Sequence, residues 1–124
     1  MNSEVEPLFS QVATYVEDLI LEGHLAQGAR VPSTNELASF HGINPATARK
    51  GLAILVGAGI IETRRGIGNF VASGAREEVQ RRRRQHFPAA FIAPLIDEAL
   101  RLGYDKGRLQ NLIDRVAASR GMYK

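Results

Sequence analysis

The sequence contains no cysteine among its 124 residues. This absence excludes disulfide bonds, thiolate metal sites and a cysteine nucleophile. No apolar run approaches the roughly 18 residues that a membrane-spanning helix needs. The acidic N-terminal string MNSEVEP also lacks the basic and apolar regions of a secretory signal. We therefore expect a cytoplasmic protein with no membrane partner.

Recognisable catalytic groupings are missing as well. The three histidines, His24, His41 and His86, have no metal-ligand spacing, and no acid or serine pairs with them in a known pattern. Two glycine-rich strings, VGAGI and GIGNFV, resemble nucleotide-binding loops, but neither follows a strand and opens a helix with the required third glycine. The sequence therefore predicts no catalytic residue, no metal site, no cofactor and no enzyme activity.

Basic charge is scarce in the first part of the chain, although the whole protein has a net charge of +3. Residues 1–74 hold five Lys and Arg against seven Asp and Glu, whereas residues 75–124 hold eleven against six. Overall basicity is therefore no argument for a nucleic-acid partner. Local clustering is the better argument, because four of the five N-terminal cations lie between Arg49 and Arg65, where Glu62 is the only acid.

Apolar spacing predicts a helix over residues 7–22, and Gly23 is placed to end it in a left-handed conformation. Ser33 and Glu36 have the spacing of a capping box, which predicts the start of a second helix that Gly42 closes. The buried side of this second helix is expected at Leu37, Ala38 and Phe40.

A third helix is predicted over residues 44–57, with Asn44 as its cap and Pro45 in its first turn. The short string FHGIN between the second and third helices predicts a helix-turn-helix. Residues 61–72 then combine alternating side chains with the turn string RGIGN, which predicts a β-hairpin. Three helices followed by a hairpin are the order of a winged helix.

The first turn of the third helix has small and polar side chains, which suits insertion into the major groove of DNA. Thr47 can bond a phosphate or touch a thymine methyl, Arg49 can bind guanine with two hydrogen bonds, and Lys50 is placed for the backbone. An ordinary surface helix is an equal alternative for this helix alone. The narrow cationic hairpin tip at Arg64 and Arg65 suits the minor groove or phosphates and favours the DNA interpretation.

From Ala75 onward the sequence is helical without strand signals, and Pro88 and Pro94 are expected to kink or break the helix. The four arginines of residues 81–84 point about 100° apart from one to the next. They predict a solvated helix surface with one or two phosphate or inter-chain contacts. Asp105 can cap a last helix. The inner side of that helix is expected at Leu109, Leu112, Ile113 and Val116.

Residues 7–72 resemble the winged-helix domain of GntR-family bacterial transcription regulators. The matching features are Pro7-Leu8, Gln11, the G-x-L-x-x-G-x-x-x-P-S run from Gly23 to Ser33, the Glu36-Leu37-Ala38 triplet and the R-x-G-x-G-x-F-V pattern from Arg64 to Val71. The N-P-x-T string at Asn44 and the ending DEALRLGYDKGRLQNLI are similar to the short YtrA-like branch of the family.

The resemblance implies a sequence-specific transcription regulator, most often a homodimeric repressor on a palindromic DNA operator. The helix at 44–57 would enter the major groove, and the wing at 61–72 would meet the minor groove or backbone. The predicted DNA-binding residues are Ser33, Asn35, Asn44, Thr47, Arg49, Lys50, Arg64, Arg65 and Gly66. The family usually has Arg where Asn35 stands, and often a polar residue where Pro45 stands. These departures shift base contacts toward Arg49 and the wing.

The predicted fold class is mainly α with a small β-hairpin: a winged helix-turn-helix over 1–73, then an all-helical dimerisation domain over 74–124. Two-fold symmetry would place two recognition helices about one DNA turn apart. The apolar set expected at the dimer interface is Phe87, Phe91, Ile92, Leu95, Ile96, Leu109, Leu112 and Ile113. A small-molecule effector in or near that interface is compatible with the sequence, which names none. The alternative function is a winged-helix protein-interaction module without specific DNA binding.

Overall fold

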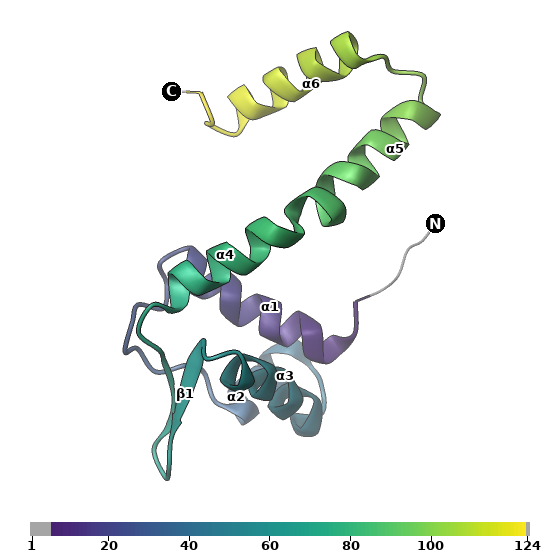
Figure 1. The fold of residues 1–124 in the computed structure, drawn as a ribbon. Helices are drawn as coiled ribbons and strands as arrows, with labels where there is room; N and C mark the ends of the chain where they lie inside the picture. The colour runs from purple at the N-terminus through teal and green to yellow at the C-terminus, as the bar shows by residue number, and fades with distance from the viewer. Residues whose placement is uncertain (1–5, 124) are drawn as a thin grey trace. The chain divides into compact units, whose positions relative to one another are not determined.

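The computed structural model describes residues 6–123 and contains helices with one two-stranded sheet (Figure 1). The elements are α1 (Leu8–Leu21), α2 (Thr34–His41), α3 (Pro45–Gly57), β1 (Ile61–Arg64), β2 (Gly68–Val71), α4 (Ala75–Phe87), the π-helical turn η1 (Pro88–Ile92), α5 (Ala93–Arg101) and α6 (Lys106–Ser119). The predicted fold class is confirmed. No helix within residues 6–123 is long and apolar enough to cross a bilayer.

The chain divides into two compact units between Arg82 and Arg83, inside α4. The N-terminal unit contains α1 to β2 and the first part of α4. The tail unit contains the rest of α4 with η1, α5 and α6. The predicted domains divide the chain earlier, between residues 73 and 74, just before α4 begins. The two units are described separately.

The N-terminal unit closes over one apolar core. Val16 of α1, Leu55 of α3 and Ile60 before β1 have no accessible surface, and Leu37 of α2 has almost none. Val79 extends the same core into the first turns of α4. Burial of each such side chain stabilises the fold by about 1.5–3 kcal/mol. This core holds α2, α3 and the hairpin in place.

The start of α2 forms the predicted capping box. The amide of Glu36 donates to the Ser33 hydroxyl oxygen at 3.1 Å, and the amide of Ser33 donates to Glu36 Oε1 at 2.8 Å. The second of these hydrogen bonds is the main reason that the pKa of Glu36 lies below its usual value. Gly42 ends the helix with a φ of +66°. The turn between α2 and α3 is therefore set by local chemistry.

Phe40 does not lie on the buried side of α2, and that prediction is wrong. Its side chain is 69% exposed and stacks on Tyr15 of α1, with 5.3 Å between the ring centroids. The ring of His41 stands edge-on to Phe40. Three residues after Leu37, a side chain points about 60° away from the core-facing direction. At the end of so short a helix, this direction leads past the core to the edge of α1.

At Gly51 the backbone of α3 lies directly against α1. A Cβ atom at Gly51 would lie 2.6 Å from the carbonyl oxygen of Phe9 and 2.9 Å from the Cβ of Val12. Real side chains essentially never approach each other so closely. Glycine is therefore the residue that lets α3 lie directly against α1, and this contact determines where the first turn of α3 is presented.

The hairpin is supported along both edges of β2. On one edge, β1 and β2 pair in the antiparallel sense. On the other edge lies the segment 28–31, where the amide of Val31 donates to the carbonyl of Asn69 at 2.8 Å. The amide of Val71 donates to the carbonyl of Ala29 at 2.9 Å. The loop before α2 thus acts as a third strand that braces the hairpin.

The helix of the tail is not broken at Pro88 or Pro94, but its α-helical pattern is interrupted by the π-helical turn η1, which begins at Pro88. Phe87 and Ala93, which flank η1, both have helical backbone angles. The amide of Ala93 donates to the carbonyl of Pro88, five residues earlier. A proline lacks an amide hydrogen and its ring crowds the carbonyl one turn back. The π-helical turn begins at the first of the two prolines and ends before the second, and the backbone keeps helical angles on both sides of it.

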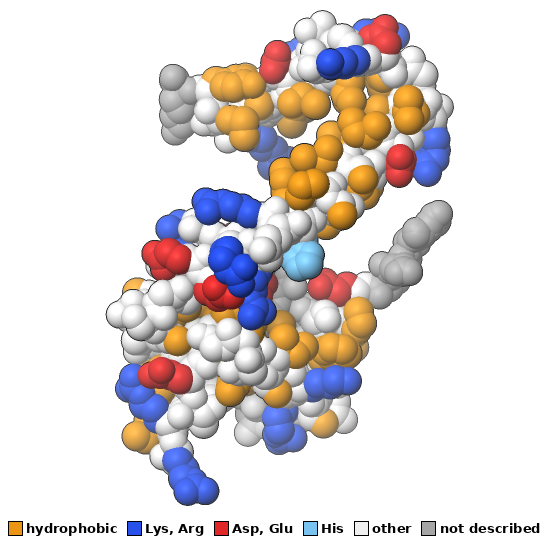
Figure 2. Space-filling model, in the orientation of Figure 1, with side chains coloured by type: hydrophobic (Ala, Val, Ile, Leu, Met, Phe, Trp, Pro, Cys, Tyr) orange, Lys and Arg blue, Asp and Glu red, His pale blue; other side chains and the backbone are white. Residues whose placement is uncertain are grey.

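The apolar side chains of the tail unit are largely open to solvent. Ala99 is the one buried residue among residues 83–123. Leu109 and Leu112 of α6 are half-buried, whereas Ile113 is 42% and Val116 56% exposed, so the predicted inner side of α6 is only partly covered. Figure 2 shows hydrophobic side chains gathered over α5 and α6. The tail unit by itself leaves an unusually large apolar surface uncovered.

Candidate nucleic-acid interface

The first turn of α3 is narrow and capped as predicted. The side-chain oxygen of Asn44 accepts a hydrogen bond from the amide of Ala46 at 2.7 Å, and Pro45 is the first residue of the helix. Pro45 and Ala46 are exposed, and Thr47 is half-buried. The cap uses the Asn44 oxygen, so its side-chain nitrogen is the group left to donate to a partner.

The two cations of α3 have different surroundings. Lys50 Nζ lies 4.1 Å from the centroid of the Phe9 ring, so this side chain turns back onto α1. Arg49 is exposed and has no hydrogen bond, ion pair or ring contact with any described residue. Of these two side chains, Arg49 is the one that is free to bind a ligand.

The two neighbouring arginines of the hairpin also differ in their surroundings, since one has partners and the other has none. The Arg64 guanidinium lies 4.1 Å from the Phe70 ring centroid and 3.6 Å from Glu62 Oε1. Arg65 is exposed and has no such partner among residues 6–123. Gly66, with a φ of +74°, follows Arg65, and Ile67 is 59% exposed. The tip therefore presents one free cation beside a glycine and an apolar side chain.

A shallow hollow of about 300 Å³ brings α3 and the hairpin together. Thr34, Arg49, Thr63 and Asn69 are among its lining residues. Thr63 donates its hydroxyl hydrogen to Asn69 Oδ1 at 2.7 Å, which ties the two strands together at this wall. The predicted recognition helix and the predicted wing are thus parts of one surface.

The predicted residues at the start of α2 lie close to this surface in sequence and structure. The Ser33 hydroxyl accepts from the Glu36 amide, as described above, and Ser33 is half-buried. Asn35 lies in the first turn of α2 and is exposed. The Ser33 hydroxyl accepts in the capping box and keeps its hydrogen to donate, whereas Asn35 has no hydrogen bond with a described residue.

The arginine run of α4 is not a free basic patch. Arg81 donates to both carboxylate oxygens of Glu78, and Arg82 donates to Glu78 Oε2 at 2.7 Å. These hydrogen bonds lower the pKa of Glu78 to about 2, so its carboxylate stays ionised at any ordinary pH. Arg83 also has a partner. This arrangement agrees with the expectation of a solvated helix surface.

The Lys and Arg side chains of residues 6–82 fall into two groups, those with a partner in the protein and those without one. Those turned toward a partner within the protein are Lys50, Arg64, Arg76, Arg81 and Arg82. Arg30, Arg49 and Arg65 have no hydrogen bond, ion pair or ring contact with a described residue. The predicted DNA-binding residues do not include Arg30, which lies far from Arg49 in the chain. The pairing of segment 28–31 with β2 is a tertiary contact that spacing alone does not indicate.

Three helices, a tight turn between the second and third, and a braced hairpin define a winged helix-turn-helix protein. Residues 8–71 match the model of the family described as "Bacterial regulatory proteins, gntR family". The chain belongs to this family, and the predicted resemblance is confirmed. A family of regulatory proteins also agrees with the expectation that the chain is not an enzyme.

Two curated relatives illustrate the match. The HTH-type transcriptional repressor YtrA of Bacillus subtilis is 36% identical over 70 residues, which cover 56% of this chain and 54% of YtrA. The uncharacterised regulator Rv0494 of Mycobacterium tuberculosis is 32% identical over 120 residues, which cover 89% of this chain and 44% of the relative. The chain spans about half the length of these relatives.

Solved structures share the fold over different lengths. A GntR family transcriptional regulator from Listeria monocytogenes matches with a TM-score of 0.71 at 23% identity, covering 92% of this chain and 98% of that one. A putative regulator of the family from Bacteroides thetaiotaomicron matches with a TM-score of 0.69 at 26% identity, covering 91% and 98%. AraR(DBD) in complex with operator ORR3 matches with a TM-score of 0.54 at 32% identity, covering 58% and 88%.

Proposed function

We propose that this protein is a sequence-specific DNA-binding transcription regulator that inserts α3 into the major groove and sets its hairpin on the minor groove or backbone. The observation that carries the proposal is the narrow first turn of α3 followed directly by the unpaired guanidinium of Arg49. A guanidinium in this position can bind the two acceptors of a guanine. AraR(DBD), which was solved in complex with operator ORR3, supports DNA binding by this fold. Such a regulator would act in the cytoplasm.

The predicted DNA-binding residues have different roles in this proposal. Arg49 reads a base, and Thr47 contacts a phosphate or a thymine methyl. The donors that position the protein on phosphates are Ser33, Asn35, Asn44, Arg65 and the amide of Gly66. Lys50 and Arg64, which lie over aromatic rings, add positive charge close to the backbone without reading bases.

We further propose that the protein is a homodimer joined through the tail unit, and that it represses from a palindromic operator. The exposed apolar side chains support the dimer, because a second copy would remove them from water. Among the predicted interface residues, Phe87, Phe91, Ile92, Leu95, Ile96 and Ile113 are at least 40% exposed in the single chain. Repression is proposed by analogy with the repressor YtrA. A small-molecule effector remains a prediction with no residue assigned to it.

Substitution of Arg49 tests the base contact. We expect Arg49→Ala to weaken binding to a site selected from random-sequence DNA by about 1–3 kcal/mol, which is roughly 5- to 150-fold. Discrimination at one base pair should relax at the same time. Fluorescence anisotropy with the selected site and with single-base variants measures both effects. Arg101→Ala, which removes an exposed arginine of the tail, should leave binding unchanged. Equal affinity of Arg49→Ala and the unaltered protein would contradict the docking mode.

Salt dependence distinguishes the proposed function from a winged-helix protein-interaction module. For a DNA-binding protein, the logarithm of the binding constant falls linearly with the logarithm of the salt concentration. The slope is about −0.9 for each phosphate neutralised. We therefore expect gel shifts on both random DNA and the DNA upstream of the protein's own gene, weakening steeply between low and moderate salt. The absence of any salt-sensitive shift on either DNA would favour the interaction module.

A further inference from the structure

Arg30 is the one free cation of the N-terminal unit, within residues 6–82, that the predicted DNA-binding set leaves out. Its side chain is exposed and has no hydrogen bond, ion pair or ring contact with a described residue. In this it resembles only Arg49 and Arg65 among the cations of that part of the chain. An arginine without such a partner is available for an external anion.

The backbone of Arg30 places this cation on the hairpin. Arg30 forms an antiparallel bridge with Phe70 of β2, within the segment that braces the outer edge of that strand. Its guanidinium then follows the hairpin toward the tip: a Cβ atom at Gly68 would lie 3.3 Å from Arg30 Nε and 3.4 Å from Arg30 Nη2. The Arg30 guanidinium therefore lies close against the backbone of Gly68, the first residue of β2 after the hairpin tip.

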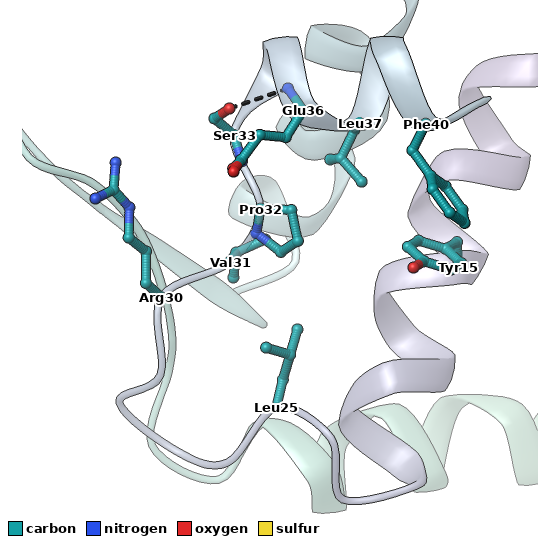
Figure 3. A pocket seen from close by; sticks show the side chains of 9 residues that line it. All are labelled: Tyr15, Leu25, Arg30, Val31, Pro32, Ser33, Glu36, Leu37 and Phe40. Carbon is teal, nitrogen blue, oxygen red and sulfur yellow. Dashed lines mark hydrogen bonds between the residues drawn. The ribbon is translucent and has the colours of Figure 1, made fainter. Parts of the chain in front are cut away.

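The other side of Arg30 faces the start of α2. Arg30 and Ser33 both line an open pocket of about 810 Å³ in front of α1 and α2. Figure 3 shows the Arg30 side chain extending beside the hairpin, away from the rings of Tyr15 and Phe40. Arg30 thus occupies the gap between the N-terminus of α2 and the hairpin. These are the two elements expected to lie along the DNA backbone.

The nearby carboxylate of Glu36 does not neutralise Arg30. Glu36 Oε1 is turned to the amide of Ser33, at 2.8 Å, and no ion pair joins Glu36 to Arg30. Arg30 contributes least among the causes that lower the pKa of Glu36, behind both hydrogen bonds with Ser33. No hydrogen bond or ion pair joins the two side chains, so the guanidinium keeps all of its donors.

We propose that Arg30 binds a DNA phosphate between the N-terminus of α2 and the hairpin, and so holds the wing in register on the duplex. This inference rests on the proposed function and adds a residue to the same interface. Guanidinium groups bind phosphate oxygens through paired hydrogen bonds. The free amides at the start of a helix favour an anion at the same place. A phosphate contact positions the protein but does not read sequence.

Arg30→Gln is the informative variant, because it removes the charge and keeps a long polar side chain. We expect the slope of log K against log salt to become less steep by about 0.9. Affinity should fall by the same factor on the selected site and on random DNA, so that their ratio is unchanged. Arg49→Ala, in contrast, should lower the ratio of the affinity for the selected site to the affinity for random DNA. Because Arg30 is exposed and makes no hydrogen bond, the midpoint of thermal unfolding should stay close to that of the unaltered protein.

Arg76→Gln is the matched control. It removes the same charge from the same unit, but Arg76 Nε donates to the carbonyl of Leu21 and does not lie on the hairpin. Its salt slope should equal that of the unaltered protein. A normal slope for Arg30→Gln, or a loss confined to the selected site, would overturn the role of Arg30 while leaving the proposed function intact. Failure of the unaltered protein to bind DNA in a salt-dependent way would overturn both.

Discussion

Ile113→Asp is expected to convert the protein from a dimer into a monomer at micromolar concentration. Ile113 is 42% exposed on α6, beside a hollow of about 690 Å³ whose wall is mostly apolar. A carboxylate placed there would have to be buried by a second copy, and the desolvation of an unpaired charge is strongly unfavourable. Multi-angle light scattering measures the mass directly.

The loss of the dimer should also weaken operator binding. Two linked recognition helices gain about 10²- to 10⁴-fold in affinity over one, because the second contact becomes intramolecular. We expect Ile113→Asp to lose affinity in this range on a palindromic site but not on a single half-site. Anisotropy on both DNAs separates these effects.

Gln110→Asp is the matched control for Ile113→Asp. It adds the same charge to the same helix, but Gln110 is exposed and does not line the apolar hollow. This variant should remain dimeric and bind the palindrome normally. A monomeric unaltered protein, or a dimeric Ile113→Asp, would contradict the assignment of the tail as the dimerisation unit.

Gly51→Ala is expected to lower the free energy of unfolding of the N-terminal unit, whereas the same change at Gly57 should not. The new Cβ would lie 2.6 Å from a backbone oxygen of α1, which cannot move aside as a flexible side-chain end could. Overpacking of this kind costs about 1–3 kcal/mol or more. Since 1 kcal/mol shifts the melting temperature of a domain of this size by roughly 4–8 °C, the change should be plain in a thermal scan followed by circular dichroism.

Gly57→Ala provides the comparison within the same helix. Nothing lies within 4 Å of a Cβ atom at Gly57, so the methyl group would meet open space. Alanine is the better helix former by about 0.5–1 kcal/mol, and this variant should melt no lower than the unaltered protein. Equal melting temperatures for Gly51→Ala and Gly57→Ala would contradict the close approach of α1 and α3.

Features decided by neighbouring residues were predictable from the sequence. The capping box of Ser33 and Glu36, the cap at Asn44 and the glycine that ends α2 all involve groups within a few positions of one another. The hairpin is similar, because β1 and β2 are joined by a turn of three residues and pair in register. Local hydrogen bonds of this kind need no knowledge of the rest of the fold.

Features decided by distant residues were not predictable. The side chain of Phe40 lies outside the buried side of α2, where it stacks on Tyr15 of α1. This outcome does not follow from helix periodicity, because it depends on how α2 lies against α1.

The sequence by itself determined the order of helices and strands, the ends of the helices and the family to which the chain belongs. It also predicted nine DNA-binding residues, which lie at the start of α2, in and before α3 and in the hairpin. Only the tertiary structure separated the free cations from those already held. The Phe9 ring of α1 holds Lys50, the Phe70 ring of the facing strand holds Arg64, and pairing with β2 places Arg30 beside the wing. The reason is physical: whether a charge is free depends on every group around it, and most of those groups are distant in sequence.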